Sequence, residues 1–72
     1  PVYLKNIQYL RQKYNMKLQD TAYLLRVSKA DASKYENGAA DMTLKQIIKL
    51  ADYFGVSLDQ LVKHDLSKEA NA

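Results

Sequence analysis

The chain has 72 residues, a net charge of +3 and no cysteine, so it makes one small domain near the lower limit for folding on a single hydrophobic core. Without cysteine, neither disulfides nor thiolate metal sites can add stability, and a reducing, cytoplasmic setting fits best. No apolar run approaches the roughly 20 residues of a membrane span, and the N-terminus lacks a signal-peptide pattern, which argues against membrane and secreted classes.

The first predicted helix spans residues 3–14. Its apolar side chains recur at spacings of four, three and four, at Tyr3, Ile7, Leu10 and Tyr14. This spacing is typical of an amphipathic helix with one face toward a core. Asn15 follows as a C-terminal cap, because asparagine tolerates the left-handed backbone conformation that closes many helices.

The second predicted helix spans residues 18–25. The same apolar spacing recurs there at Leu18, Ala22 and Leu25. The residue before this helix is Lys17, which is a poor N-terminal cap. The start of the helix therefore depends on packing and on Asp20, whose negative charge in the first turn favours the helix dipole.

Three later helices carry clearer start signals, in which a hydroxyl residue is followed three positions later by a polar residue. These pairs are Ser28 with Asp31, Thr43 with Gln46, and Ser57 with Gln60. The capping-box spacing predicts helices over 29–37, 44–54 and 58–64. Gly38 and Gly55 follow two of them as C-terminal caps. Strand signals are absent, so the predicted fold is all-α with five short helices.

The apolar positions of the five helices predict the hydrophobic core. Its expected members are Ile7, Leu10, Met16, Ala22, Leu25, Val27, Ala32, Tyr35, Leu44, Ile47, Ile48, Ala51, Phe54, Val56, Leu58 and Leu61. Burial of each large aliphatic side chain contributes roughly 1.5–3 kcal/mol, which is enough for a compact domain of modest stability. Residues 1–64 are expected to form this domain, and the polar segment 65–72 is expected to be a flexible tail.

The positive charge lies in the first half of the chain. Residues 1–38 carry seven lysines and arginines against three acids, a net of +4, whereas residues 39–72 carry four lysines against five acids, a net of −1. A basic front half favours a surface that faces a polyanion, and a near-neutral back half favours a structural role.

The predicted helix over 29–37 has two different faces at 100° per residue. The inner face, which must meet the body of the domain, carries Ala32, Tyr35 and Glu36. The outer face carries Ala30, Ser33, Lys34 and Asn37. Small polar side chains and one cation suit a helix that lies close against DNA base edges. An ionised Glu36 on the inner face requires a partner.

Several spaced segments together carry a family pattern. They are Ile7, Leu10-Arg11, Met16, Ala22, Leu25, Val27-Ser28, Tyr35-Glu36-Asn37-Gly38, Leu50-Ala51 and the run from Phe54 to Leu61. In this order they resemble the Cro and phage-repressor type of helix-turn-helix DNA-binding domain (XRE-like, or lambda repressor-like) over roughly residues 4–64. The resemblance implies a five-helix domain, with the helix-turn-helix at 18–25 and 29–37. It also implies repressor-like binding to double-stranded operator DNA, usually as a homodimer, in a bacterium or a phage.

The resemblance further implies the roles of individual residues. The positions that reach bases are Lys29, Ala30, Ser33 and Lys34. The positions that the family uses to contact phosphates are Ser28, Asn37 and the loop backbone from Gly38. Beside these we expect phosphate contacts from the basic residues Lys17 and Arg26, which the family pattern does not supply. Lysine can donate to guanine O6 and N7, and an alanine methyl can contact a thymine methyl. The family geometry also places Arg11 beside Glu36 as a partly buried ion pair, which we expect to orient the helices.

Several residues depart from the family pattern, and four of them lie in the helix-turn-helix itself, beside Asp31 and the loop at Ala39-Ala40, which lacks the usual basic residues. Leu18 replaces the glutamine that is usual at the start of the second helix, and Arg26 stands where the turn usually has glycine. Thr21 and Ala32 are smaller than the usual aliphatic residues. We therefore expect strain at Arg26 if its backbone is left-handed, and a thin core between the two helices.

Two alternatives to a simple regulator stay open. An antitoxin that represses its own operon would have the same sequence features at this length. A helix-turn-helix fold used as a protein-interaction module is the other, and the residues that favour it are Leu18, Tyr23, Leu24 and Asp31. An enzyme is not predicted, because the chain offers no nucleophile–base pair and no set of metal ligands, and its single histidine, His64, stands alone. No cofactor is expected.

Overall fold

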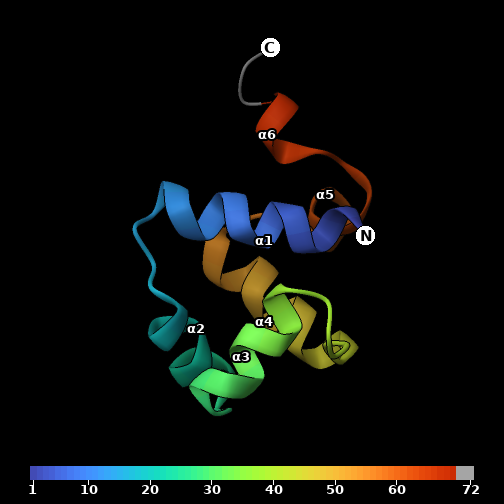
Figure 1. The fold of residues 1–72 in the computed structure, drawn as a ribbon. Coiled ribbons are helices and arrows are strands. Elements are labelled where there is room, and N and C mark those ends of the chain that lie inside the picture. The colour runs from blue at the N-terminus through green and yellow to red at the C-terminus, as the bar shows by residue number, and fades with distance from the viewer. Residues whose placement is uncertain (70–72) are drawn as a thin grey trace.

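The computed structural model describes residues 1–69, which form six helices and no strand. The helices are α1 (Val2–Lys13), α2 (Leu18–Leu25), α3 (Lys29–Glu36), α4 (Leu44–Phe54), α5 (Leu58–Lys63) and α6 (Leu66–Glu69). The predicted all-α fold is confirmed, and the first five helices lie within one residue of their predicted bounds. Figure 1 shows α2 and α3 together at one end of the molecule and α6 at the other.

The sixth helix lies in the segment for which a flexible tail was expected. Asn6 of α1 is fully buried and holds this segment with three hydrogen bonds. Its side-chain amide donates to the carbonyl oxygens of Leu61 (2.7 Å) and His64, and its side-chain oxygen accepts from the backbone N–H of Leu66 (3.0 Å). Leu66 is itself buried in the core. Residues 70–72 of the expected tail lie outside the described residues.

The helix starts use the predicted capping residues. Two helices begin with a complete capping box, in which each residue's side chain accepts a hydrogen bond from the other's backbone N–H. These are Thr43 with Gln46 at α4 and Ser57 with Gln60 at α5. At α3, the hydroxyl oxygen of Ser28 accepts from the backbone N–H of Asp31 (3.0 Å). At α2, the carboxylate of Asp20 accepts from the backbone N–H of Lys17 (2.9 Å). The α2 start thus depends on Asp20, because a lysine side chain has no acceptor to offer.

Four of the helix ends have a left-handed residue. Gly38 and Gly55 have φ angles of 82° and 70°, and Asn15 has 54°. A Cβ at Gly55 would meet no atom within 4 Å, so the backbone conformation and not the space explains the glycine there. Arg26, the C-cap of α2, has φ 58° and ψ 45°. The backbone of Arg26 is therefore left-handed, which is the condition under which strain was expected, because this conformation is unfavourable for a residue with a Cβ.

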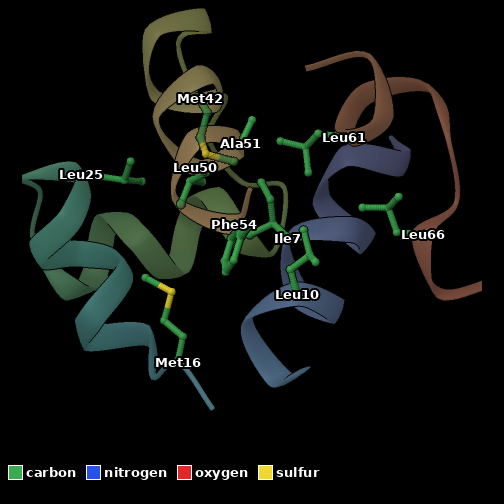
Figure 2. Packing of buried hydrophobic residues seen from close by; sticks show 10 residues of the cluster. All are labelled: Ile7, Leu10, Met16, Leu25, Met42, Leu50, Ala51, Phe54, Leu61 and Leu66. Atoms are coloured by element: carbon green, nitrogen blue, oxygen red, sulfur yellow. The ribbon is translucent and has the colours of Figure 1, made fainter. Parts of the chain in front are cut away.

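The core lies between α1, α4 and α5 and extends to Leu25 and Met16. Figure 2 shows its side chains converging from these helices. The buried cluster consists of Ile7, Leu10, Met16, Leu25, Met42, Leu50, Ala51, Phe54, Leu61 and Leu66. Two predicted members, Leu44 and Ile48, are instead 63% and 40% exposed. The stripe that packs is the one through Leu50 and Ala51, and residues 44 and 48 lie at its outer edge.

Candidate nucleic-acid interface

The α2–turn–α3 unit is held by small residues at its centre. Ala32 of α3 is 1% exposed, and Thr21 and Ala22 of α2 are also buried. Small side chains let two helices approach closely, so the thin core expected here is a close helix pair in the structure. The left-handed Arg26 and the cap at Ser28 turn the chain between the two helices. This packing and this turn hold α3 against α2, so that one face of α3 points toward solvent.

The outer face of α3 carries the side chains expected to reach bases. Lys29, Ala30 and Lys34 are exposed, and Ser33 is half-buried. Within residues 1–69, neither lysine of this face forms an ion pair or a side-chain hydrogen bond. Their ammonium groups are therefore free to donate to an acceptor in solution. The short side chain of Ala30 beside them allows another molecule to approach the α3 backbone closely.

The residues expected to contact phosphates are all exposed, namely Lys17, Arg26, Ser28, Asn37 and Gly38. Asn37 uses its side-chain oxygen to accept from the backbone N–H of Ala39 (3.0 Å), which leaves its amide N–H groups to donate outward. The backbone N–H of Gly38 donates to the Tyr35 carbonyl (3.3 Å), and the N–H groups of Ala39 and Ala40 donate to the Lys34 carbonyl. The backbone at Gly38, Ala39 and Ala40 thus offers close approach, while its own N–H groups are already bonded within the domain.

An ion pair lies behind α3, between the two residues for which it was expected. The Nε and Nη2 atoms of Arg11 donate to one carboxylate oxygen of Glu36 at 3.1 and 2.7 Å. The two side chains are 20% and 15% exposed. Nη1 of Arg11 donates to the carbonyl oxygen of Met16 at 2.9 Å. One guanidinium therefore joins α1, the connection to α2 and the last turn of α3.

The structure adds a second support for α3 that the sequence analysis missed. The side-chain amide of Gln8 donates to the carbonyl oxygen of Glu36 at 3.1 Å. Gln8 lies on the exposed side of α1, where its spacing gives no signal of this role. Leu18, which takes the place of the usual glutamine, lines the same shallow hollow as Gln8 and Asn37. In this chain the amide next to α3 comes from α1 and not from α2.

The carboxylates with perturbed pKa values lie at the opposite end of the domain. The hydroxyl of Ser67 and the ammonium of Lys5 hold the pKa of the Asp65 carboxyl well below its usual range. The ammonium of Lys63 lowers the pKa of Asp59. These anions are part of the α5–α6 region, so the negative charge they keep is remote from the free lysines of α3 (Figure 1).

Comparison with known proteins decides the family. The helix-turn-helix family profile matches residues 7–61, which include α2, the turn and α3. The chain belongs to the XRE-type helix-turn-helix family. It is 35% identical over 66 residues to the HTH-type transcriptional regulator AnsR of Bacillus subtilis (strain 168). That alignment covers 92% of this chain and 57% of the relative, so the chain spans little more than half of the relative's length. No solved structure matches the chain significantly.

Membership of this family identifies a DNA-binding domain rather than an enzyme. The described residues contain no group of three or more His, Cys, Asp or Glu side chains placed to hold a metal ion. No helix within 1–69 is both long and apolar enough to cross a membrane.

Proposed function

We propose that this domain belongs to a transcriptional regulator, most simply a bacterial or phage repressor in the cytoplasm, and that it binds operator DNA by inserting α3 into the major groove. The observation that carries the proposal is the outer face of α3, where Lys29 and Lys34 are exposed without partners on a helix held from behind by Arg11 and Glu36. A rigid helix with short side chains and free donors fits the readout of base edges.

The proposed contacts divide into two classes. Lys29, Ala30, Ser33 and Lys34 face the bases, whereas Lys17, Arg26, Ser28 and Asn37 surround them and face the phosphates. Gly38 contributes by close approach of the chain, since its N–H is already bonded. The amide of Asn37 is oriented for its task because its oxygen is held by Ala39.

The test is a selection from random-sequence duplex DNA followed by binding measurements on the selected site. We expect log affinity to fall linearly with log salt, since each phosphate contact releases counterions. Lys34→Ala should cost sequence preference, by about 1–3 kcal/mol on the selected site and little on random DNA. Arg26→Ala should weaken binding on all sequences and reduce the salt slope by about 1.

The matched control is Lys13→Ala, which removes the same charge from α1, where the ammonium lies over the ring of Tyr14. Affinity of this variant should stay close to that of the wild type. Failure of any duplex to be enriched, or an affinity independent of salt, would contradict the proposal.

We infer a homodimer on DNA from the family, with α5 and the following residues as the contact between copies. Two copies would then place their α3 helices about 34–36 Å apart, which is one turn of DNA. Sedimentation with and without the selected duplex tests the inference. A protein that stays monomeric in both conditions, on a site without two-fold symmetry, would contradict the dimer but not the DNA binding.

A further inference from the structure

A basic concavity lies between α2 and α4, outside the outer face of α3. It consists of two adjoining depressions of about 490 Å³ and about 340 Å³ that share Arg26 and Lys49. The remaining lining residues are Ala22, Tyr23, Leu24 and Val27 in the first, and Leu25, Lys45 and Gln46 in the second. We call the two adjoining depressions, with these lining residues, the α2–α4 groove. None of the residues that line it is acidic.

The cations of the groove have no counter-charge. Arg26, Lys45 and Lys49 are exposed, and none of them forms an ion pair with another residue of the described chain. Three unpaired cations around one hollow create a positive potential that attracts an anionic group. Lys5, Arg11 and Lys63, by contrast, all pair with carboxylates elsewhere in the domain.

The groove also offers apolar surface. Tyr23 is 88% exposed, the largest exposure among the exposed large hydrophobic residues of the described chain. Leu24 and Val27 are partly buried against the core. An exposed aromatic ring beside cations is the composition of a protein-binding hot spot, in which tyrosine and arginine dominate. A phosphodiester backbone would use the cations but leave the tyrosine and the aliphatic floor in water.

We propose that the α2–α4 groove docks an acidic segment of a partner protein, with carboxylates at Arg26, Lys45 and Lys49 and an apolar side chain against Tyr23 and Val27. The complementarity of charge selects the acidic partner, and the aliphatic floor selects a polypeptide over a nucleic acid. Lys45 and Lys49 lie on α4 and have no part in the proposed DNA contacts. Arg26 is shared between the groove and the proposed phosphate contacts, whereas none of the residues proposed to face the bases lines the groove.

The first experiment is a phage-display selection of random peptides on the wild-type domain, with counter-selection on Lys45→Glu/Lys49→Glu. Enriched peptides should combine aspartate or glutamate with a large apolar residue. In ¹⁵N-labelled domain, a selected peptide should shift the amide signals of Tyr23, Arg26, Lys45 and Lys49 but not those of residues 30–34. Affinity should fall by about tenfold or more in the double variant, in line with the loss of close charge pairs.

The matched control is Lys13→Glu/Lys68→Glu, which changes the net charge equally but leaves the groove intact. An equal loss of affinity in this control would show general charge attraction and overturn the proposal. A selection that yields no acidic peptide sensitive to Lys45→Glu/Lys49→Glu would do the same. If the selected DNA duplex shifts the amide signals of Lys45 and Lys49, and the double variant loses DNA affinity to the same extent as Lys34→Ala, the groove is a phosphate-binding surface instead.

Discussion

The guanidinium of Arg11 donates twice to a single carboxylate oxygen of Glu36, so that α1 and the last turn of α3 are joined by one ion pair. Both side chains are mostly buried. Pairs of this kind gain little net free energy, because desolvation offsets most of the attraction. We expect the pair instead to define the position of α3 relative to α1 more narrowly than a purely apolar contact would.

Removal of one member of the pair should therefore destabilise the domain more than removal of both. Arg11→Met leaves the Glu36 carboxylate and the Met16 carbonyl without their donor, and we expect a loss of about 2–3 kcal/mol in the free energy of unfolding. Arg11→Met/Glu36→Leu should recover part of that loss. Urea unfolding of the three proteins measures both values. A double variant no more stable than Arg11→Met would contradict this account.

Thr21 offers a stabilising substitution. Its hydroxyl oxygen is buried without a hydrogen-bond partner among the described residues. Thr21→Val keeps the shape and the β-branch while removing the unsatisfied group, so the free energy of unfolding should rise by about 1 kcal/mol. Thr43→Val is the matched control, because the Thr43 hydroxyl caps α4 and its loss should cost about 1 kcal/mol. Thermal and urea unfolding should show opposite signs for the two variants.

Arg26→Gly separates backbone strain from charge. The left-handed conformation costs a residue with a Cβ about 1–2 kcal/mol of folding free energy, and glycine avoids this cost. Part of the gain is lost again, because glycine gives the unfolded chain a greater conformational entropy. We expect a net gain of about 0.5–1 kcal/mol in stability for Arg26→Gly and none for Arg26→Ala. Both variants lose the same cation, so their DNA affinities should fall alike. Equal stability of the two variants would show that Arg26 carries no strain.

Asn6 should be sensitive to any change. Asn6→Ala leaves the carbonyl groups of Leu61 and His64 and the N–H of Leu66 unpaired, which we expect to cost about 2–4 kcal/mol. Asn6→Asp retains the acceptor but loses the donors. Hydrogen exchange at the Leu66 amide distinguishes the two, because only the alanine variant loses its acceptor. Unchanged protection of that amide in Asn6→Ala would contradict the arrangement.

Acid should weaken the contact between α1 and α6. The pKa of Asp65 is lower in the folded protein than in the unfolded chain, where an aspartate titrates at about 3.9. Its contribution to stability is therefore complete above that value and is lost as the pH falls toward the folded pKa. Between about pH 5 and about pH 2.5, Asp65→Asn should lose less stability than the wild type. Asp41→Asn, at an exposed site without an ion pair within 1–69, should follow the wild type.

The helices could be predicted because their signals are local. Each predicted start at Ser28, Thr43 and Ser57 is a cap in the structure. Helix α6 could not be predicted, since its segment is short and is held by Asn6 from the other end of the chain. The exposure of Leu44 and Ile48 was missed for a similar reason: periodicity identifies the apolar residues of α4 but not how wide a stripe its neighbours cover.

The candidate site divides in the same way. The two faces of α3 follow from helical periodicity, and the Arg11–Glu36 pair followed from family resemblance. Gln8 carries no local signal, because an exposed glutamine on α1 meets the Glu36 carbonyl only after the chain has folded. The occupied N–H of Gly38 and the α2–α4 groove likewise depend on contacts between segments that no spacing in the sequence reveals.

Helix α1 links two ends of the molecule mechanically. Asn6 forms hydrogen bonds with the C-terminal helices, and Arg11 forms an ion pair with α3. Both residues lie on one rigid helix, roughly 7.5 Å apart along its axis. The orientation of α3 therefore depends on α5 and α6, through α1, and not only on its contact with α2. A partner subunit or a further segment of chain that displaced α5 and α6 would tilt α1, and through it the surface that α3 presents.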